Sequence, residues 1–171
     1  LKNNKRNLPI VYGIGGNNTQ NVLEEIIDTD LSGVTAILSV SPYYNKPSQE
    51  GIYHHFMAVA NVSPVPVILY NVPGRTSSNL TADTTLRLAQ LKNIIGIKEA
   101  SVNLEQCMKI AKEKPKDFML ISGDDLLTLA LYAIGSAGVI SVLANAYPVV
   151  FRKIRENFMA GKLAQAQQAQ F

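Results

Sequence analysis

Short apolar runs alternate with segments of helical periodicity along the whole chain. The runs are rich in β-branched residues, and the segments after them repeat apolar positions at about the 3.6-residue period of a helix. The apolar runs occupy residues 9–12, 36–40, 66–70, 94–97, 118–121 and 138–142. The helical segments occupy residues 19–29, 49–60, 82–90, 104–112 and 126–134, and a last one begins at 149. This pattern predicts six consecutive β-α units.

Continuous apolar strands joined by helices predict a parallel sheet that is buried on both faces. Such a sheet is either open and doubly wound or closed into a barrel, and the hydrophobic pattern alone does not separate the two. Polar side chains, however, follow the ends of successive strands: Asn17, Tyr43, Tyr44, Tyr70, Arg75, Lys98 and Asp124. Contributions from successive strands to one face favour the mouth of a β/α barrel over a single crevice.

A complete barrel of this class has eight β-α units. The six found here therefore predict a TIM-type barrel whose first two units are absent from this chain. We expect residues 1–148 to form the partial barrel. Residues 149–171 are expected to form its last helix and the start of a C-terminal helical region.

Composition and charge exclude several classes of protein. The chain is 47% hydrophobic and 17% charged, which predicts a globular core rather than disorder. The net charge of +3 is spread along the sequence, so it does not indicate binding to nucleic acid or membranes. Because Cys107 is the only cysteine, no intrachain disulfide can form, and we expect a cytoplasmic protein.

Lys98 directly follows a buried strand and is the first candidate for chemistry. Partial desolvation favours the neutral amine, the form that attacks carbonyl groups, so Lys98 could form a Schiff base. A strand-end lysine can equally extend its ammonium to water or pair with Glu99. Position alone does not decide between these interpretations.

Two further candidates lie one strand earlier. Tyr70 ends its strand, and its phenol could transfer protons to and from an imine on Lys98, although a packed tyrosine with a bonded hydroxyl is the common alternative. Arg75 follows a Pro-Gly turn and could hold a carboxylate with its planar guanidinium, or could be solvated. Tyr43 and Tyr44 lie together in a proline-flanked loop that suits an active site or an interface.

Two other features predict no ligand. The glycine-rich segment 13–18 lacks the spacing of a dinucleotide loop. His54 and His55 are adjacent on a predicted helix and have no partner at a spacing that suits a metal. We expect them to be surface or packing residues, and we predict no metal site.

Several segments together resemble the dihydrodipicolinate synthase (4-hydroxy-tetrahydrodipicolinate synthase) family, within the N-acetylneuraminate lyase and class I aldolase superfamily. The resemblance rests on YNVPxRT at 70–76 and IGIKEA at 95–100. It is extended by PYYNxP at 42–47, SGDD at 122–125 and GVISVxAN at 138–145. These segments occur in the family's order and cover nearly the whole chain.

The resemblance implies roles for particular residues. Lys98 would form the imine with pyruvate, with Tyr70 as the proton-transfer residue and Arg75 holding the carboxylate of L-aspartate 4-semialdehyde. Tyr44 would cross a dimer interface into the neighbouring subunit's proton relay. Gly123 and Ile140 would line the pyruvate pocket. Tyr43 and Asn17 match positions that contact lysine in feedback-inhibited members.

The resemblance also implies a reaction and partners. The enzyme would condense pyruvate with aspartate semialdehyde in lysine (diaminopimelate) biosynthesis, without metal or organic cofactor, as a homotetramer built as a dimer of dimers. Two alternatives stay open. The reaction could be that of N-acetylneuraminate lyase or another 2-oxo acid aldolase, or the protein could be a non-catalytic homologue that binds 2-oxo acids.

The chain departs from the family at its start, where the Gly-Thr-Thr-Gly-Glu segment that helps to bind pyruvate is missing. A protein that began at Leu1 would have unpaired strand edges and a broken proton relay. We expect such a fragment to be inactive and poorly soluble.

Overall fold

The computed structural model describes residues 4–171. Its centre is one parallel sheet in which six strands follow each other in chain order, from β1 to β6. The strands are β1 (Val11–Gly13), β2 (Ala36–Val40), β3 (Val67–Asn71), β4 (Ile94–Glu99), β5 (Met119–Ser122) and β6 (Gly138–Val139). The predicted parallel β-α order is therefore confirmed.

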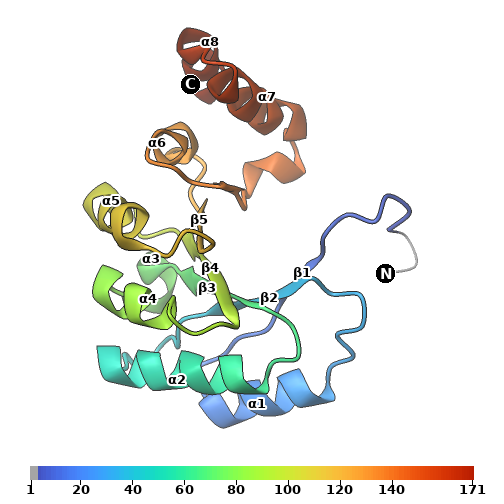
Figure 1. Cartoon of the computed structure of the whole chain (residues 1–171), viewed down its shortest axis with the longest axis vertical. Helices are drawn as coiled ribbons and strands as arrows, with labels where there is room; N and C mark the ends of the chain where they lie inside the picture. Colours follow the sequence, from blue (N-terminus) through green and yellow to red (C-terminus); the bar gives the residue numbers. More distant parts are fainter. Residues whose placement is uncertain (1–3) are drawn as a thin grey trace.

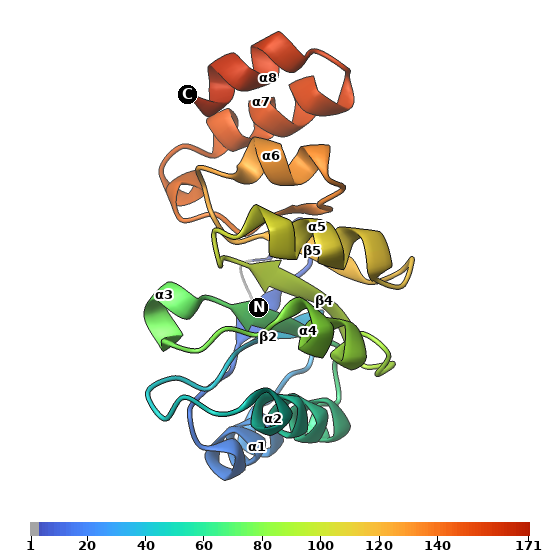
Figure 2. The same ribbon diagram turned by 90° about the vertical axis from the view of Figure 1, so that its left-hand side faces the viewer.

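Helices connect the strands and cover one side of the sheet (Figures 1 and 2). They are α1 (Thr19–Asp28), α2 (Gln49–Val62), α3 (Pro73–Thr76), α4 (Ala82–Leu88), α5 (Leu104–Glu113), α6 (Thr128–Ala133), the 3-10 helix η1 (Leu143–Asn145), α7 (Pro148–Met159) and α8 (Leu163–Gln170). Seen from the helix side, the helices ascend in chain order from α1 and α2 through α4, α5 and α6 to α7 and α8, and α3 lies to one side of α4 (Figure 2). This order follows from the crossover geometry of parallel strands.

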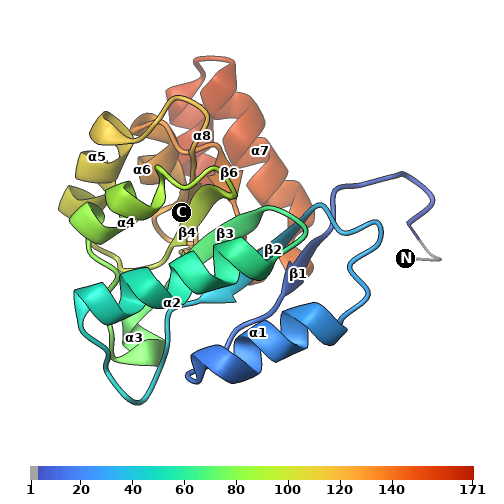
Figure 3. The same cartoon turned by 60° about the horizontal axis from the view of Figure 1, so that its bottom comes forward.

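The two sides of the sheet carry different cores. Alternate residues of the strands, such as Ile37, Leu69 and Ile97, are fully buried against the helices in the main hydrophobic cluster. On the other side, a smaller cluster is built around Ala36 and Ile68 together with Ile121. We call these the helix-facing side and the inner side. Figure 3 shows β1 at the edge of the sheet, away from α4 and α5.

The sequence placed most elements within two residues of their observed bounds, but it missed some ends. Polar Lys98 and Glu99 extend β4 beyond the apolar run, because a strand continues as long as its backbone is paired with its neighbours. The run at 138–142 yields only the two-residue strand β6. The predicted Pro-Gly turn is the one-turn helix α3, which starts at Pro73, a position where proline's fixed φ suits a helix.

The C-terminal helices form a separate small cluster. Leu129 and Tyr132 of α6 pack with Ile154 of α7 and Ala166 of α8, and α8 lies at the end of the molecule opposite α1 (Figure 1). The division at residue 148 stays a prediction. In residues 4–171, every helix is too short or too polar to cross a membrane.

Candidate active site

Tyr70 and Lys98 lie side by side at the ends of two neighbouring strands. They are register partners in the pairing of β3 with β4, and both alternate with helix-facing residues, which turns their side chains to the inner side. The Nζ atom of Lys98 is 4.2 Å from the centroid of the Tyr70 ring. An amine and a phenol are thus held within reach of one small molecule.

Lys98 is buried rather than extended to water, since only 8% of its surface is exposed. This burial lowers the pKa of the amine, and the negative charge of Asp125 partly opposes the change. Burial likewise raises the pKa of the Tyr70 phenol, although the nearby charge of Arg75 acts in the opposite direction. The pair therefore combines an amine that loses its proton readily with a phenol that keeps its proton.

The alternative in which Lys98 pairs with Glu99 is not observed. Glu99 is 2% exposed and faces the helices, on the opposite side of β4. Its carboxylate bonds to amide groups, and residues 4–171 contain no ion pair between the two side chains.

Gly123 borders Lys98 at the end of β5. A β-carbon at this glycine would lie 3.0 Å from Cγ of Lys98 and 2.8 Å from Cβ of Ala100. Because such contacts are shorter than side chains tolerate, only glycine lets Lys98 keep this position.

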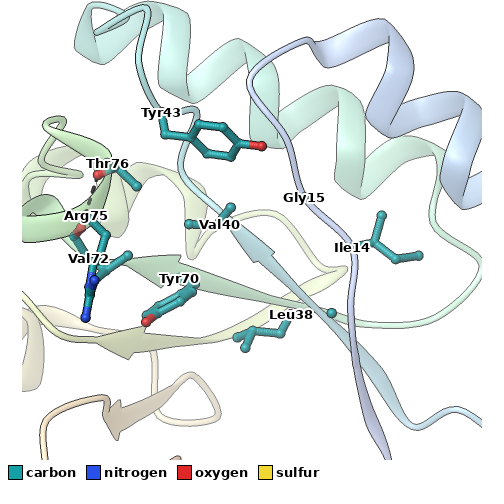
Figure 4. Close-up of a pocket in the computed structure, with 10 residues that line it drawn as sticks. Ile14, Gly15, Leu38, Val40, Tyr43, Tyr70, Val72, Arg75 and Thr76 are labelled. Atoms are coloured by element: carbon teal, nitrogen blue, oxygen red, sulfur yellow. Dashed lines mark hydrogen bonds between the residues drawn. The ribbon is translucent and has the colours of Figure 1, made fainter.

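A cavity of about 460 Å³ opens beside Tyr70 (Figure 4). Arg75 and Tyr43 line it, and so do Val72 and Thr76, which sequence reasoning missed. The helix α3 carries Arg75 and closes on Thr76, whose hydroxyl donates to the carbonyl oxygens of Val72 and Ser78. The lining of the cavity thus includes both an exposed cationic side chain and the phenol of Tyr70.

A hydrogen-bonded network on the helix-facing side was also missed. Asn71 and Glu99 each directly follow a candidate catalytic residue. The side-chain amide of Asn71 donates to both carboxylate oxygens of Glu99, each at 3.1 Å. Strand alternation could have indicated that they face away from the site. Their shared partner Gln106 lies on a different helix, which the local pattern does not reveal.

The two histidines differ in environment, and neither has a metal-binding neighbourhood. His55 is 3% exposed and its Nδ1 lies 2.9 Å from Oγ1 of Thr19, while His54 is exposed beside Glu50. Burial lowers the pKa of His55 from 6.5 to about 4. Within the described range, His, Cys, Asp and Glu side chains do not gather in threes that could hold a metal ion.

The sequence profile described as the dihydrodipicolinate synthetase family matches residues 1–171 of this chain. The chain belongs to this family. The 4-hydroxy-tetrahydrodipicolinate synthase of Flavobacterium psychrophilum is 58% identical over 152 residues, which are 88% of this chain and 52% of the relative. The chain thus spans about half the length of the curated relatives that it matches.

Solved structures of the family share the fold. Dihydrodipicolinate synthase from Bacillus anthracis matches with a TM-score of 0.93 and 40% identity, over 97% of this chain and 56% of that one. The enzyme from Acinetobacter baumannii, complexed with pyruvate, matches with a TM-score of 0.90 and 39% identity, over 98% and 57%. The α/β barrel class predicted from the sequence is confirmed, with six of its β-α units in this chain.

The candidate residues of this chain do not all line one cavity. Lys98 and Gly123 lie next to each other but do not line the cavity of Arg75. Ile140 lines a second cavity of about 520 Å³ on the inner side of the sheet. Asn17 contributes its carbonyl oxygen, which accepts a hydrogen bond of 3.0 Å from Asn45.

Tyr44 lines neither of these cavities. It is 87% exposed, and its backbone has a φ of 72°, in the left-handed region that non-glycine residues rarely adopt. The Tyr44 ring is therefore left largely uncovered by the rest of residues 4–171.

Proposed function

We propose that the full-length protein is a 4-hydroxy-tetrahydrodipicolinate synthase. It condenses pyruvate with L-aspartate 4-semialdehyde in lysine (diaminopimelate) biosynthesis. One observation carries the proposal: a buried lysine whose pKa is lowered lies 4.2 Å from a tyrosine ring at the ends of adjacent barrel strands. The name borne by relatives at 45–58% identity supports the choice of reaction.

The neutral amine of Lys98 would attack the carbonyl carbon of pyruvate and form a carbinolamine. Loss of water then gives an imine, which makes the methyl group of pyruvate acidic enough to form an enamine. Tyr70 would supply and accept protons in these steps, because the raised pKa of its phenol keeps it protonated between transfers.

The enamine carbon would next attack the aldehyde carbon of aspartate semialdehyde. The substrate's own amine then displaces Lys98 from the imine, closes the ring and restores the free lysine. Arg75 suits the acceptor's carboxylate, because its guanidinium lines the cavity beside Tyr70 and makes no ion pair with the carboxylates of residues 4–171. Gly123 would leave room for the lysine, and Ile140 would border pyruvate from the inner side.

The loop that carries Tyr43 and Tyr44 supports a further part of the proposal, assembly as a dimer of dimers. A strained, exposed tyrosine costs about 1 kcal/mol in an isolated subunit, which favours a role in a partner's site. Tyr44 would enter the neighbouring subunit's proton relay. Tyr43 and Asn17 would face bound lysine in a feedback-inhibited enzyme.

The proposal needs no resident cofactor, because the imine on Lys98 itself withdraws electrons from pyruvate. It also places the enzyme in the cytoplasm, where amino-acid biosynthesis draws on pyruvate.

Comparison of two acceptors tests this function. The full-length protein is incubated with pyruvate and either aspartate semialdehyde or N-acetylmannosamine, and pyruvate consumption is followed. We expect consumption with aspartate semialdehyde and its loss in the Lys98→Arg variant. Consumption of pyruvate with N-acetylmannosamine but not with aspartate semialdehyde would instead indicate an N-acetylneuraminate lyase. A protein that binds pyruvate but consumes it with neither acceptor would be a non-catalytic homologue.

A further inference from the structure

Glu99 is a buried carboxylate whose partners are amide groups. Its Oε1 accepts the backbone N–H of Ser101 at 2.7 Å, and its Oε2 accepts the side-chain N–H of Gln106 at 3.0 Å. Both oxygens also share the side-chain amide of Asn71 at 3.1 Å. Within residues 4–171, no lysine, arginine or histidine pairs with this carboxylate. Burial of a carboxylate without a cation is costly, and these hydrogen bonds offset that cost.

Every contact around Glu99 requires an acceptor at this position. Asn71 cannot turn its amide over, because its Oδ1 already accepts the backbone N–H of Leu80 at 2.9 Å. Gln106 is fixed in the same way, since its Oε1 accepts from Asn79 at 2.9 Å. A carboxylate is the only side chain of this size with two acceptor oxygens and no donor.

The network also joins the two ends of the segment that carries Arg75. The side chain of Asn71 donates to Oδ1 of Asn79 at 2.8 Å and accepts from the backbone of Leu80, so the segment 71–80 is tied at its two ends. Arg75 lies midway along this segment, on α3. Glu99 holds the closing residue Asn71 in place from β4.

The two members of the network that lie on strands are each adjacent to a site residue. Asn71 follows Tyr70 and Glu99 follows Lys98, and both pairs are in register across β3 and β4. Because successive side chains of a strand point to opposite sides, a bond between Asn71 and Glu99 sets the relative position of Tyr70 and Lys98.

We propose that Glu99 is a positioning residue, which aligns Tyr70, Lys98 and the Arg75 segment from the helix-facing side of the sheet without touching substrate. This inference rests on the proposed imine chemistry of Lys98. It adds a residue whose effect on that chemistry passes through the backbone.

The substitution Glu99→Gln tests the inference, because it keeps the size of the side chain and turns one acceptor into a donor. In the full-length protein with pyruvate and borohydride, we expect the trapping rate of Lys98 at saturating pyruvate to fall about tenfold, since small misalignments are costly in rate. The pyruvate concentration at half-maximal rate should change less than twofold. Glu99→Asp, which retains two acceptors, should recover part of the rate.

Val59→Ala is the matched control for stability, because Val59 is fully buried on α2, away from the network. It should lower Tm as Glu99→Gln does, but leave trapping unchanged. Equal trapping in wild type and Glu99→Gln would overturn the inference and leave the proposed function intact. A wild-type protein without any adduct would instead overturn the proposed function.

Gln106→Ala provides the second variant if Glu99→Gln does not fold. It removes one donor to Glu99 from the half-buried surface of α5. We expect about a threefold loss of trapping, in the same direction as the larger change. A rate equal to that of wild type would reject the positioning role.

Discussion

At the ends of β3 and β4, the polar side chains on the two sides of the sheet have different environments. On the inner side, Tyr70 and Lys98 approach each other closely, and the burial of the amine lowers its pKa. On the helix-facing side, Asn71 and Glu99 are fully hydrogen-bonded and tied to neighbouring segments. Polar residues of one strand can thus be reactive or structural according to the side of the sheet that they face.

The two sides also differ in how their polar groups affect the free energy of unfolding. A satisfied network favours the folded state, whereas an amine held in a partly dry site disfavours it. Substitutions that remove the reactive groups of Tyr70 and Lys98 should therefore lower activity with little loss of stability, whereas substitutions in the apolar packing among the helices should act on stability.

The largest effect is expected for Tyr70→Phe on the inner side. Loss of the proton-transferring hydroxyl should lower kcat by about 100-fold, the usual scale of general acid-base catalysis. The free energy of unfolding should change by less than about 1 kcal/mol, because the ring is retained. Steady-state kinetics and urea denaturation measure the two quantities. Tyr53→Phe, on the helix side, should leave kcat unchanged.

His55, between α1 and α2, should make stability depend on pH. Its pKa is about 4 in the folded protein and 6.5 ordinarily, so between these values only the unfolded chain is protonated. Stability is therefore lost as the pH falls from 6.5 to 4, by up to about 3 kcal/mol. Urea denaturation across this range should show a steep loss in wild type and a flatter profile in His55→Leu.

The exposed neighbour His54 provides the matched control. His54→Leu should keep the steep pH profile of wild type. If His55→Leu were as steep as wild type, the buried histidine would not be the source of the acid sensitivity.

Gly123→Ala should disturb the inner side through sterics. The added carbon would lie 2.8 Å from Cβ of Ala100 and 3.0 Å from Cγ of Lys98, so we expect a loss of about 2 kcal/mol and slower imine trapping. Gly138→Ala is the control, because an added carbon there meets no atom within 4 Å. Equal unfolding midpoints for the two variants would contradict the steric account.

The smallest effect is a gain in stability for Lys98→Met. The lowered pKa of Lys98 means that its charge opposes folding fully below that pKa, and the cost is lost as the pH rises from that pKa to the ordinary pKa of a lysine amine. At neutral pH the variant should be more stable by about 1 kcal/mol and inactive. A less stable Lys98→Met protein would show that the charged amine supports the fold.

The sequence predicted the strands and the position of Lys98 because apolar runs and strand ends are local features. It did not predict α3, since Pro73 and Gly74 are equally typical of a turn. The orientation of Glu99 follows from alternation once β4 is known to include it. The partner Gln106 could not be predicted, because its contact depends on how α5 packs against the sheet.

The sharpest test of the imine chemistry is the mass of the Lys98 peptide after the full-length protein is treated with pyruvate and borohydride. The account predicts a reduced pyruvate adduct on Lys98, absent without pyruvate and absent from the other lysine peptides. A protein that consumes pyruvate and aspartate semialdehyde without forming this adduct, or that carries it on another lysine, would contradict the account.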